Sequence, residues 1–170
     1  DMNMTHYMGL LADNQPWNLI LFMAIPVILA ETIAIAELYL LFTRNMSGTV
    51  KAISRYAGMF VGVYMLGVLG YLTWTAAIPL TLMGEWKGIA DVLAVGCYLL
   101  AAFPLIGIGM MEFGLIGSKR SEEEKLRLHA TFVALFLVLA HVAMIFGMID
   151  PTILGWMPEG EHVMNGMVMQ

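Results

Sequence analysis

The first candidates for chemistry are ionisable side chains in long apolar stretches of this sequence: Glu31, Glu37, Glu112 and His141 lie within them, and His129 lies near one edge. An ionised side chain at the centre of a bilayer costs at least about 3 kcal/mol, so such groups usually face the interior of a helical bundle. At a rise of about 1.5 Å per residue, Glu31 and His141 come out at one depth. Glu37 and Glu112 come out at a second depth, near His129. We therefore predict two polar layers.

Three roles fit these layers. The groups can hold helices together through polar contacts, they can bind protons or a quinone, or they can ligate a metal or haem b. A haem with two histidine ligands needs both at similar depth on different segments, whereas His129 and His141 are about 18 Å apart on one helix. The four long apolar stretches contain no Glu-x-x-His pair, which argues against a di-iron carboxylate bundle.

The two ends of the chain resemble each other in composition, because each combines one histidine with several methionines. The candidate ligands are His6, Met4 and Met8 at the first end and His162, Met164 and Met167 at the last. Thioether and imidazole groups suit Cu(I), which makes a copper site joining the two ends one interpretation. Methionine is common throughout, at 16 of 170 residues, so packing or contact with a partner is the favoured one.

Other chemistry is not indicated. The sequence has no G-x-S-x-G, P-loop or H-E-x-x-H motif, and its single cysteine, Cys97, excludes an intramolecular disulfide and a cysteine metal cluster. No basic patch of the kind that binds nucleic acid is present. We expect a protein that is not an enzyme on its own and does not bind nucleic acid.

The elements that would position these groups are membrane helices. Of the residues, 60% are hydrophobic and 12% are charged, against about 25% charged in a typical soluble domain. Four apolar stretches reach the roughly 20 residues that a spanning helix needs: 17–42, 56–83, 89–116 and 122–149. Ser121 and Glu124 form a capping box before the last stretch. Short loops predict a single membrane domain, residues 1–170, folded as an all-α antiparallel up-down bundle of four transmembrane helices.

The basic residues set the expected orientation. Seven of the eight lie in or beside the first and third loops, which places these loops in the cytoplasm and both termini on the outer side. All four tryptophans fall near outer helix ends, as an aromatic belt would place them. We expect an integral protein of a bacterial inner membrane. Gly58 and Gly62 form a G-x-x-x-G pair that lets helices approach closely.

These observations favour a small non-catalytic membrane subunit of a redox or respiratory assembly, in which the buried Glu and His groups serve protons, a quinone or haem. The first alternative is a protein that binds or transports copper with its Met- and His-rich ends. The second is a structural scaffold. The expected partners are the lipid bilayer and either other membrane subunits or further copies of the chain.

Overall fold

The computed structural model describes residues 3–158, and in this part of the chain the regular structure is entirely helical. Four helices are long and apolar enough to cross a membrane: Trp17–Thr43, Thr49–Met83, Gly88–Glu112 and Glu122–Met148. The all-α class and the four helices of spanning length are therefore confirmed.

Two of these long helices contain a wider π-helical turn shortly before a proline. The first consists of α2 (Trp17–Leu19), the π turn η1 (Ile20–Ala24) and α3 (Ile25–Thr43). The second consists of α4 (Thr49–Leu72), the π turn η2 (Thr73–Ala77) and α5 (Ile78–Met83). Pro26 and Pro79 lack the N–H of an α-helical bond and their rings clash with the preceding turn. The wider turns accommodate both prolines without ending either helix.

The remaining elements are α6 (Gly88–Glu112), α7 (Glu122–Met148), the short α1 (His6–Ala12) and a 3₁₀ turn, η3 (Pro151–Leu154). Helix α6 ends at Glu112, before the predicted residue 116, because Gly114 and Gly117 adopt positive φ angles of 77° and 67°. The capping box of α7 is present: Glu124 N donates to Ser121 Oγ at 3.3 Å, and Ser121 N donates to Glu124 Oε2 at 3.2 Å.

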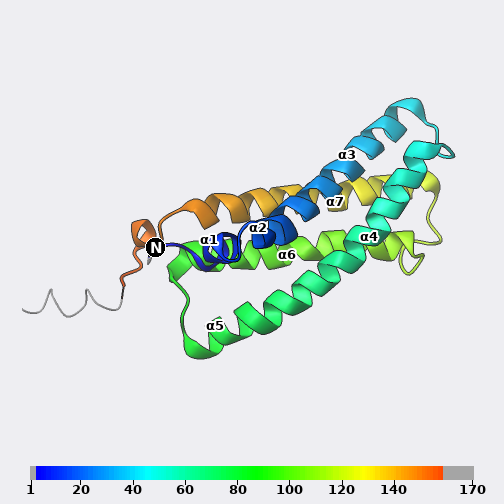
Figure 1. The fold of residues 1–170 in the computed structure, drawn as a ribbon. Coiled ribbons are helices and arrows are strands. Elements are labelled where there is room, and N and C mark those ends of the chain that lie inside the picture. Colours follow the sequence, from blue (N-terminus) through cyan, green and yellow to red (C-terminus); the bar gives the residue numbers. More distant parts are fainter. Residues whose placement is uncertain (1–2, 159–170) are drawn as a thin grey trace, which may run out of the picture.

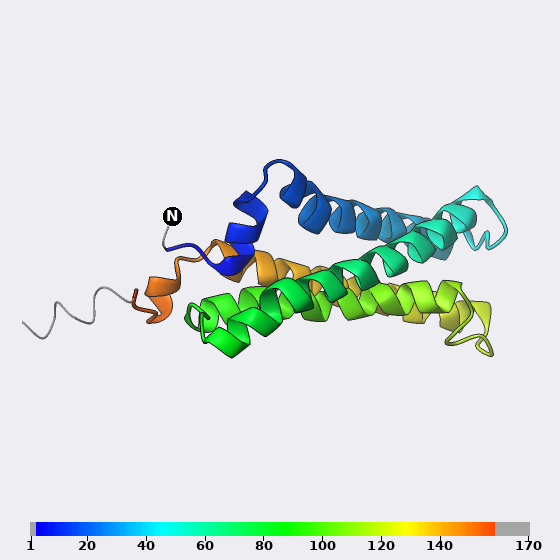
Figure 2. The same cartoon turned by 60° about the horizontal axis from the view of Figure 1, so that its bottom comes forward.

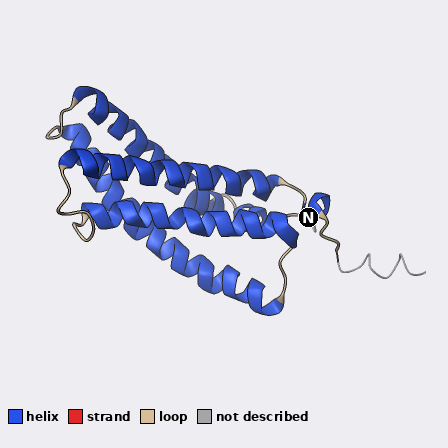
Figure 3. Ribbon diagram, turned by 180° about the vertical axis from the view of Figure 1, so that it is seen from behind, coloured by secondary structure: helices blue, strands red, loops and turns tan. Residues whose placement is uncertain are grey.

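The loops divide the molecule into two ends (Figure 1). The connections α3–α4 and α6–α7 lie at one end, which we call the two-loop end. Helix α1, the α5–α6 turn and η3 lie at the other, which we call the terminal end (Figures 1 and 3). Helix α6 packs against both α4 and α7 (Figure 2). Helix α3 packs against α4 and α7.

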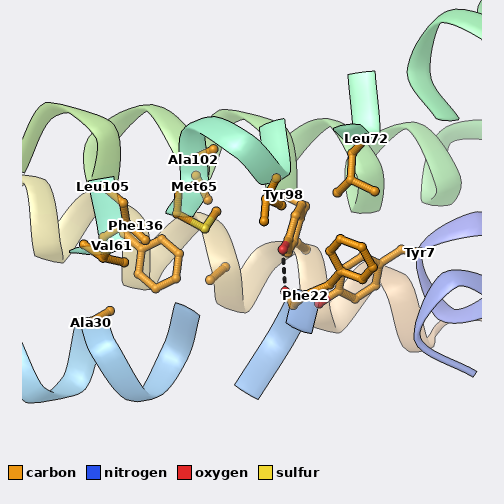
Figure 4. Close-up of a cluster of buried hydrophobic side chains, with 14 of the residues drawn as sticks. Tyr7, Phe22, Ala30, Val61, Met65, Leu72, Tyr98, Ala102, Leu105 and Phe136 are labelled. Atoms are coloured by element: carbon orange, nitrogen blue, oxygen red, sulfur yellow. Dashed lines mark hydrogen bonds between the residues drawn. The ribbon is translucent and has the colours of Figure 1, made fainter. Parts of the chain in front are cut away.

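The middle of the molecule is an apolar core (Figure 4). Val61, Met65 and Leu105 are completely buried there. Nearer the terminal end, the hydroxyl of Tyr98 on α6 donates a hydrogen bond to the carbonyl of Phe22, which belongs to the π turn η1 (Figure 4). A π turn leaves backbone carbonyls without their usual intrahelical partner, so this bond satisfies one of them and ties α6 to the first long helix.

The G-x-x-x-G pair on α4 packs against α6. A Cβ atom placed on Gly62 would lie 2.6 Å from Gly109 Cα. One on Gly58 would lie 3.0 Å from Glu112 Cγ. The two backbones therefore approach to a distance that only glycine allows, as the motif predicted.

Candidate functional site: a buried Glu–His–Glu cluster

The imidazole of His129 on α7 lies between two carboxyl groups from two other helices. Its Nδ1 atom is in direct contact with Glu37 Oε1 on α3, and its Nε2 atom lies 3.0 Å from Glu112 Oε1 on α6. His129 and Glu37 are only 5% and 3% exposed, and the side chain of Glu112 is 13% exposed. The prediction that these three residues form one polar layer is confirmed.

Two atoms of the cluster are buried without completing a hydrogen bond of ordinary geometry: Glu37 Oε1 and His129 Nε2. Both nevertheless lie against an oppositely charged or polar neighbour. Most buried polar atoms in proteins have a well-formed partner, so these two atoms are unusual for a protein interior. Two carboxylates and one neutral imidazole can together bind up to three protons. The imidazole can accept a proton on one ring nitrogen and release a proton from the other.

Glycine at position 58 makes room for the cluster. A Cβ atom there would lie 3.0 Å from Glu112 Cγ and 3.5 Å from His129 Nε2. Helix α4 therefore contributes a bare backbone surface against which Glu112 and His129 can meet. Because Gly62 lies one turn further along the same face, the close approach of α4 and α6 also fixes where Glu112 lies.

A cavity of about 290 Å³ connects the cluster to the two-loop end. Glu112 and His129 line it, together with basic side chains from α4 and α7: Lys51, Arg55 and Lys125. Glu37 is not part of its lining and lies deeper. Glu112 and His129 thus both face the cavity, while Glu37 lies at the buried end and contacts His129.

The other predicted layer does not form. Glu31 and His141 are both exposed, so the prediction that they face the interior together is wrong. Successive helical residues turn by about 100°, so Glu31 points about 120° away from Glu37, and His141 points about 120° away from His129. Since Glu37 and His129 are at one level, Glu31 lies about 9 Å and His141 about 18 Å towards the terminal end. Nδ1 of His141 instead lies 2.5 Å from the carbonyl of Leu137 in its own helix.

The sequence pattern did not predict a further buried acid, Asp91. Asp91, in the first turn of α6, is completely buried at the terminal end. Its carboxylate accepts hydrogen bonds from the backbone N–H groups of His6 at 2.7 Å and Lys87 at 3.0 Å, and His6 Nδ1 lies 2.5 Å from its Oδ2. The available signal was an aspartate at the positive end of a helix dipole. Asp91 fixes the ring of His6 and anchors α1 to α6.

The predicted metal ligands are only partly described. His162, Met164 and Met167 lie outside residues 3–158, so the copper site joining the two ends stays a prediction. Within residues 3–158, no group of three or more His, Cys, Asp or Glu side chains is arranged to hold a metal ion. Both ring nitrogens of His129 face carboxyl groups, so a haem at His129 would have to displace one of them.

Comparison with known proteins adds a family but no described activity. No curated protein and no solved structure matches the chain. Residues 2–163 match a protein family, and this match covers nearly the whole chain. The chain therefore belongs to the family of unknown function DUF6803.

Proposed function

We propose that this protein is a non-catalytic subunit of a redox or respiratory membrane assembly, and that its Glu37–His129–Glu112 cluster takes up and releases protons from the inner side of the membrane. In this proposal the four long helices form an antiparallel bundle in a bacterial inner membrane. The two-loop end faces the cytoplasm and both termini face outward. The observation that supports the proton role is the histidine ring held between carboxyl groups of two other helices.

The chemistry of the three groups suits reversible proton binding. A proton that enters through the cavity can bind the Glu112 carboxylate, because Glu112 lines the cavity and its side chain is 13% exposed, against 6% for His129. It can pass to Nε2 of His129, and the imidazole can then release the proton on Nδ1 to Glu37. Each transfer exchanges one N–H or O–H bond for another between neighbours, so no group needs to leave its place.

The apolar core makes the cluster a proton store rather than a channel. Apart from tyrosines, the buried polar side chains of the described residues are confined to the two ends of the molecule. Glu37, Ser54 and His129 lie at the two-loop end, and Thr5 and Asp91 lie at the terminal end. Between them the core is built from residues such as Ile33, Val61 and Leu105. Among the described residues, the buried core beyond Glu37 holds no further carboxyl or imidazole group before the terminal end, so a proton on Glu37 returns by the route it entered.

Exposed ionisable groups support membership of an assembly. Glu31 and His141 lie on faces of α3 and α7 that would meet lipid if the chain were alone. Exposing an ionised side chain to hydrocarbon costs at least about 3 kcal/mol, so such groups normally contact protein or water. A partner helix with polar side chains at these depths would remove that cost.

The orientation rests on charge. The two-loop end carries seven of the eight Lys and Arg residues, including Lys51, Arg55 and Lys125 around the cavity. Membrane proteins keep such residues on the cytoplasmic side. The same residues give the cavity a charged lining, unlike the mostly apolar wall of a pocket for a quinone-like ligand. This favours protons over a quinone.

Infrared difference spectroscopy of the protein in lipid tests the proton role. Between about pH 5 and pH 8, we expect the protonated-carboxyl band and the histidine bands to change together. Glu37→Gln should remove part of the pH-dependent change in the protonated-carboxyl band and alter the pH-dependent change in the histidine bands. Glu112→Gln should slow proton entry, because it removes the most exposed ionisable group of the cluster.

Glu31→Gln is the matched control, because Glu31 lies on the same helix as Glu37 but outside the cluster. It should leave the histidine change unaltered. If the three groups only hold helices together, the protonation of His129 and both acids will stay fixed over this range, and the proposal fails. Partners are tested separately by mass spectrometry of the chains that co-purify.

A further inference from the structure

Four methionine side chains from three elements line one cavity near the terminal end. Met8 comes from α1, Met23 from the π turn η1, and Met144 and Met148 from one face of α7. The cavity has a volume of about 200 Å³. A sphere of that volume is about 7 Å across, so flexible thioether side chains on its wall can reach a common point inside it.

Among the described residues, the lining contains no anionic ligand. Tyr7 is the one titratable side chain in it, and burial raises the pKa of Tyr7 to about 12, so its hydroxyl stays protonated at neutral pH. Hard divalent cations such as Mg²⁺ and Ca²⁺ need charged or carbonyl oxygen ligands. Soft thioether sulfur instead selects soft, singly charged ions such as Cu(I).

An adjoining cavity of about 380 Å³ offers an approach for a cation. It shares Met8 and Met148 with the first cavity and adds Met4 and Asp150. Hydrogen bonds from the hydroxyl (2.7 Å) and the backbone N–H (2.9 Å) of Thr152 hold the pKa of Asp150 below its ordinary value. Asp150 is therefore ionised at neutral pH, and its charge attracts cations to the entrance.

From this arrangement we propose that Met8, Met23, Met144 and Met148 form a binding site for Cu(I), with Met4 and Asp150 at its entrance. The site differs from one that joins the two ends of the chain, because its ligands come from α1, η1 and α7 and it needs neither His6 nor His162. His6 is already held by Asp91. The proposal does not depend on the proton role of the cluster, which lies at the opposite end of the bundle.

Packing alone explains this cavity less well. Methionine is common in cores because it fills irregular gaps. Here, however, four methionines line a hollow that is open to the outside, and Met148 is 67% exposed, whereas Ile33, Leu105 and Ile108 are completely buried. An ion coordinated by sulfur would occupy that space.

The test uses the purified full-length chain in detergent, with Ag(I) as a probe that does not change oxidation state and Cu(I) kept reduced. We expect one ion per chain in competition with a chromophoric Cu(I) chelator, and a first coordination shell of sulfur alone by X-ray absorption. In the double variant Met8→Leu with Met148→Leu, the affinity for Cu(I) should fall by more than about 100-fold. Loss of a group that only supports a metal ligand typically lowers metal affinity by about 10–100-fold, and loss of two direct ligands should lower it further. Leucine conserves side-chain volume and removes only sulfur.

Controls separate the possible outcomes. Met83→Leu changes an exposed methionine of α5 outside both cavities and should leave binding unaltered. Replacing His162, Met164 and Met167 together should also leave it unaltered. If the double variant unfolds, the Cu(I) affinity of the single variants Met23→Leu and Met144→Leu provides a second test. The proposal is overturned if the wild-type chain binds no Cu(I) or Ag(I), if its shell contains nitrogen or oxygen in place of sulfur, or if only the C-terminal replacements abolish binding.

Discussion

Replacing Gly62 with alanine places a methyl group where α4 and α6 nearly touch. The new Cβ atom would lie 2.6 Å from Gly109 Cα and 3.1 Å from Gly109 N, and both are backbone atoms that no rotamer change can move. Non-bonded carbons prefer separations of about 3.5–4.0 Å. The helices must therefore separate by about 1 Å at this point.

The expected cost follows from that displacement. Overpacking a well-packed interior typically costs about 1–3 kcal/mol. Alanine recovers up to about 1 kcal/mol through its higher helix propensity, so the net effect is a loss of stability. Gly67→Ala on the same helix is the matched control, because its Cβ atom would meet nothing within 4 Å. That variant should be as stable as the wild type or slightly more stable.

Reversible unfolding in mixed detergent micelles measures both variants. The displacement should also reach the cluster, because Glu112 follows Gly109 by one turn of α6, so the histidine infrared change described above should shift in Gly62→Ala and not in Gly67→Ala. If Gly62→Ala is as stable as Gly67→Ala and has the same infrared response, the close approach of α4 and α6 does not position Glu112, and the reasoning is wrong.

Three further predictions concern transport, orientation and local electrostatics. Liposomes that contain only this chain should dissipate a pH gradient no faster than empty liposomes, because an apolar core separates Glu37 from the terminal end. The gradient is measured with a pH-sensitive dye enclosed in the liposomes. Faster dissipation would contradict the proton-store interpretation. A reporter active only outside the cytoplasm should give signal when fused to the C-terminus, and one active only inside should not; the opposite pattern would invert the orientation. Thr152→Ala should raise the pKa of Asp150 towards its ordinary value, measured by carboxyl ¹³C NMR, because one of its hydrogen bonds is lost. Folding lowers the pKa of Asp150, so its hydrogen bonds stabilise the folded state at pH values above the unfolded-state pKa. This stabilisation is lost as the pH falls through the folded-state pKa. An unchanged pKa in Thr152→Ala would show that the hydroxyl has no such effect.

The sequence was sufficient to predict the helices and one polar layer. Length and hydropathy determine which segments can cross a membrane, and a fixed rise per residue places Glu37 and Glu112 at a common depth near His129. The capping box could be predicted because its two residues, Ser121 and Glu124, are only three positions apart in the sequence.

The facing direction of each polar group was harder to predict. A membrane helix is apolar on all sides, so hydrophobic periodicity does not reveal which side packs inward. The rule of 100° per residue excluded Glu31 from the layer only once Glu37 was known to face His129. The depth match of Glu31 with His141 failed for the same reason, because the true register between α3 and α7 is set by the contact at His129.

Contacts between distant segments were not predictable at all. His6 and Asp91 are 85 positions apart, and nothing periodic links them. The methionines around the terminal-end cavity are spread from Met8 to Met148, so composition indicated that methionine is abundant without showing which side chains meet.

The most direct test of the central claim is ¹⁵N NMR of the ring of His129 in lipid bilayers, recorded from about pH 4 to pH 9. If the Glu37–His129–Glu112 cluster takes up protons, the ring nitrogens should change between neutral and doubly protonated forms within this range. Glu37→Gln should shift the midpoint of that change, and Glu31→Gln should not. A ring that keeps one tautomer and one charge throughout, in the wild type and in both variants, would contradict the proton role.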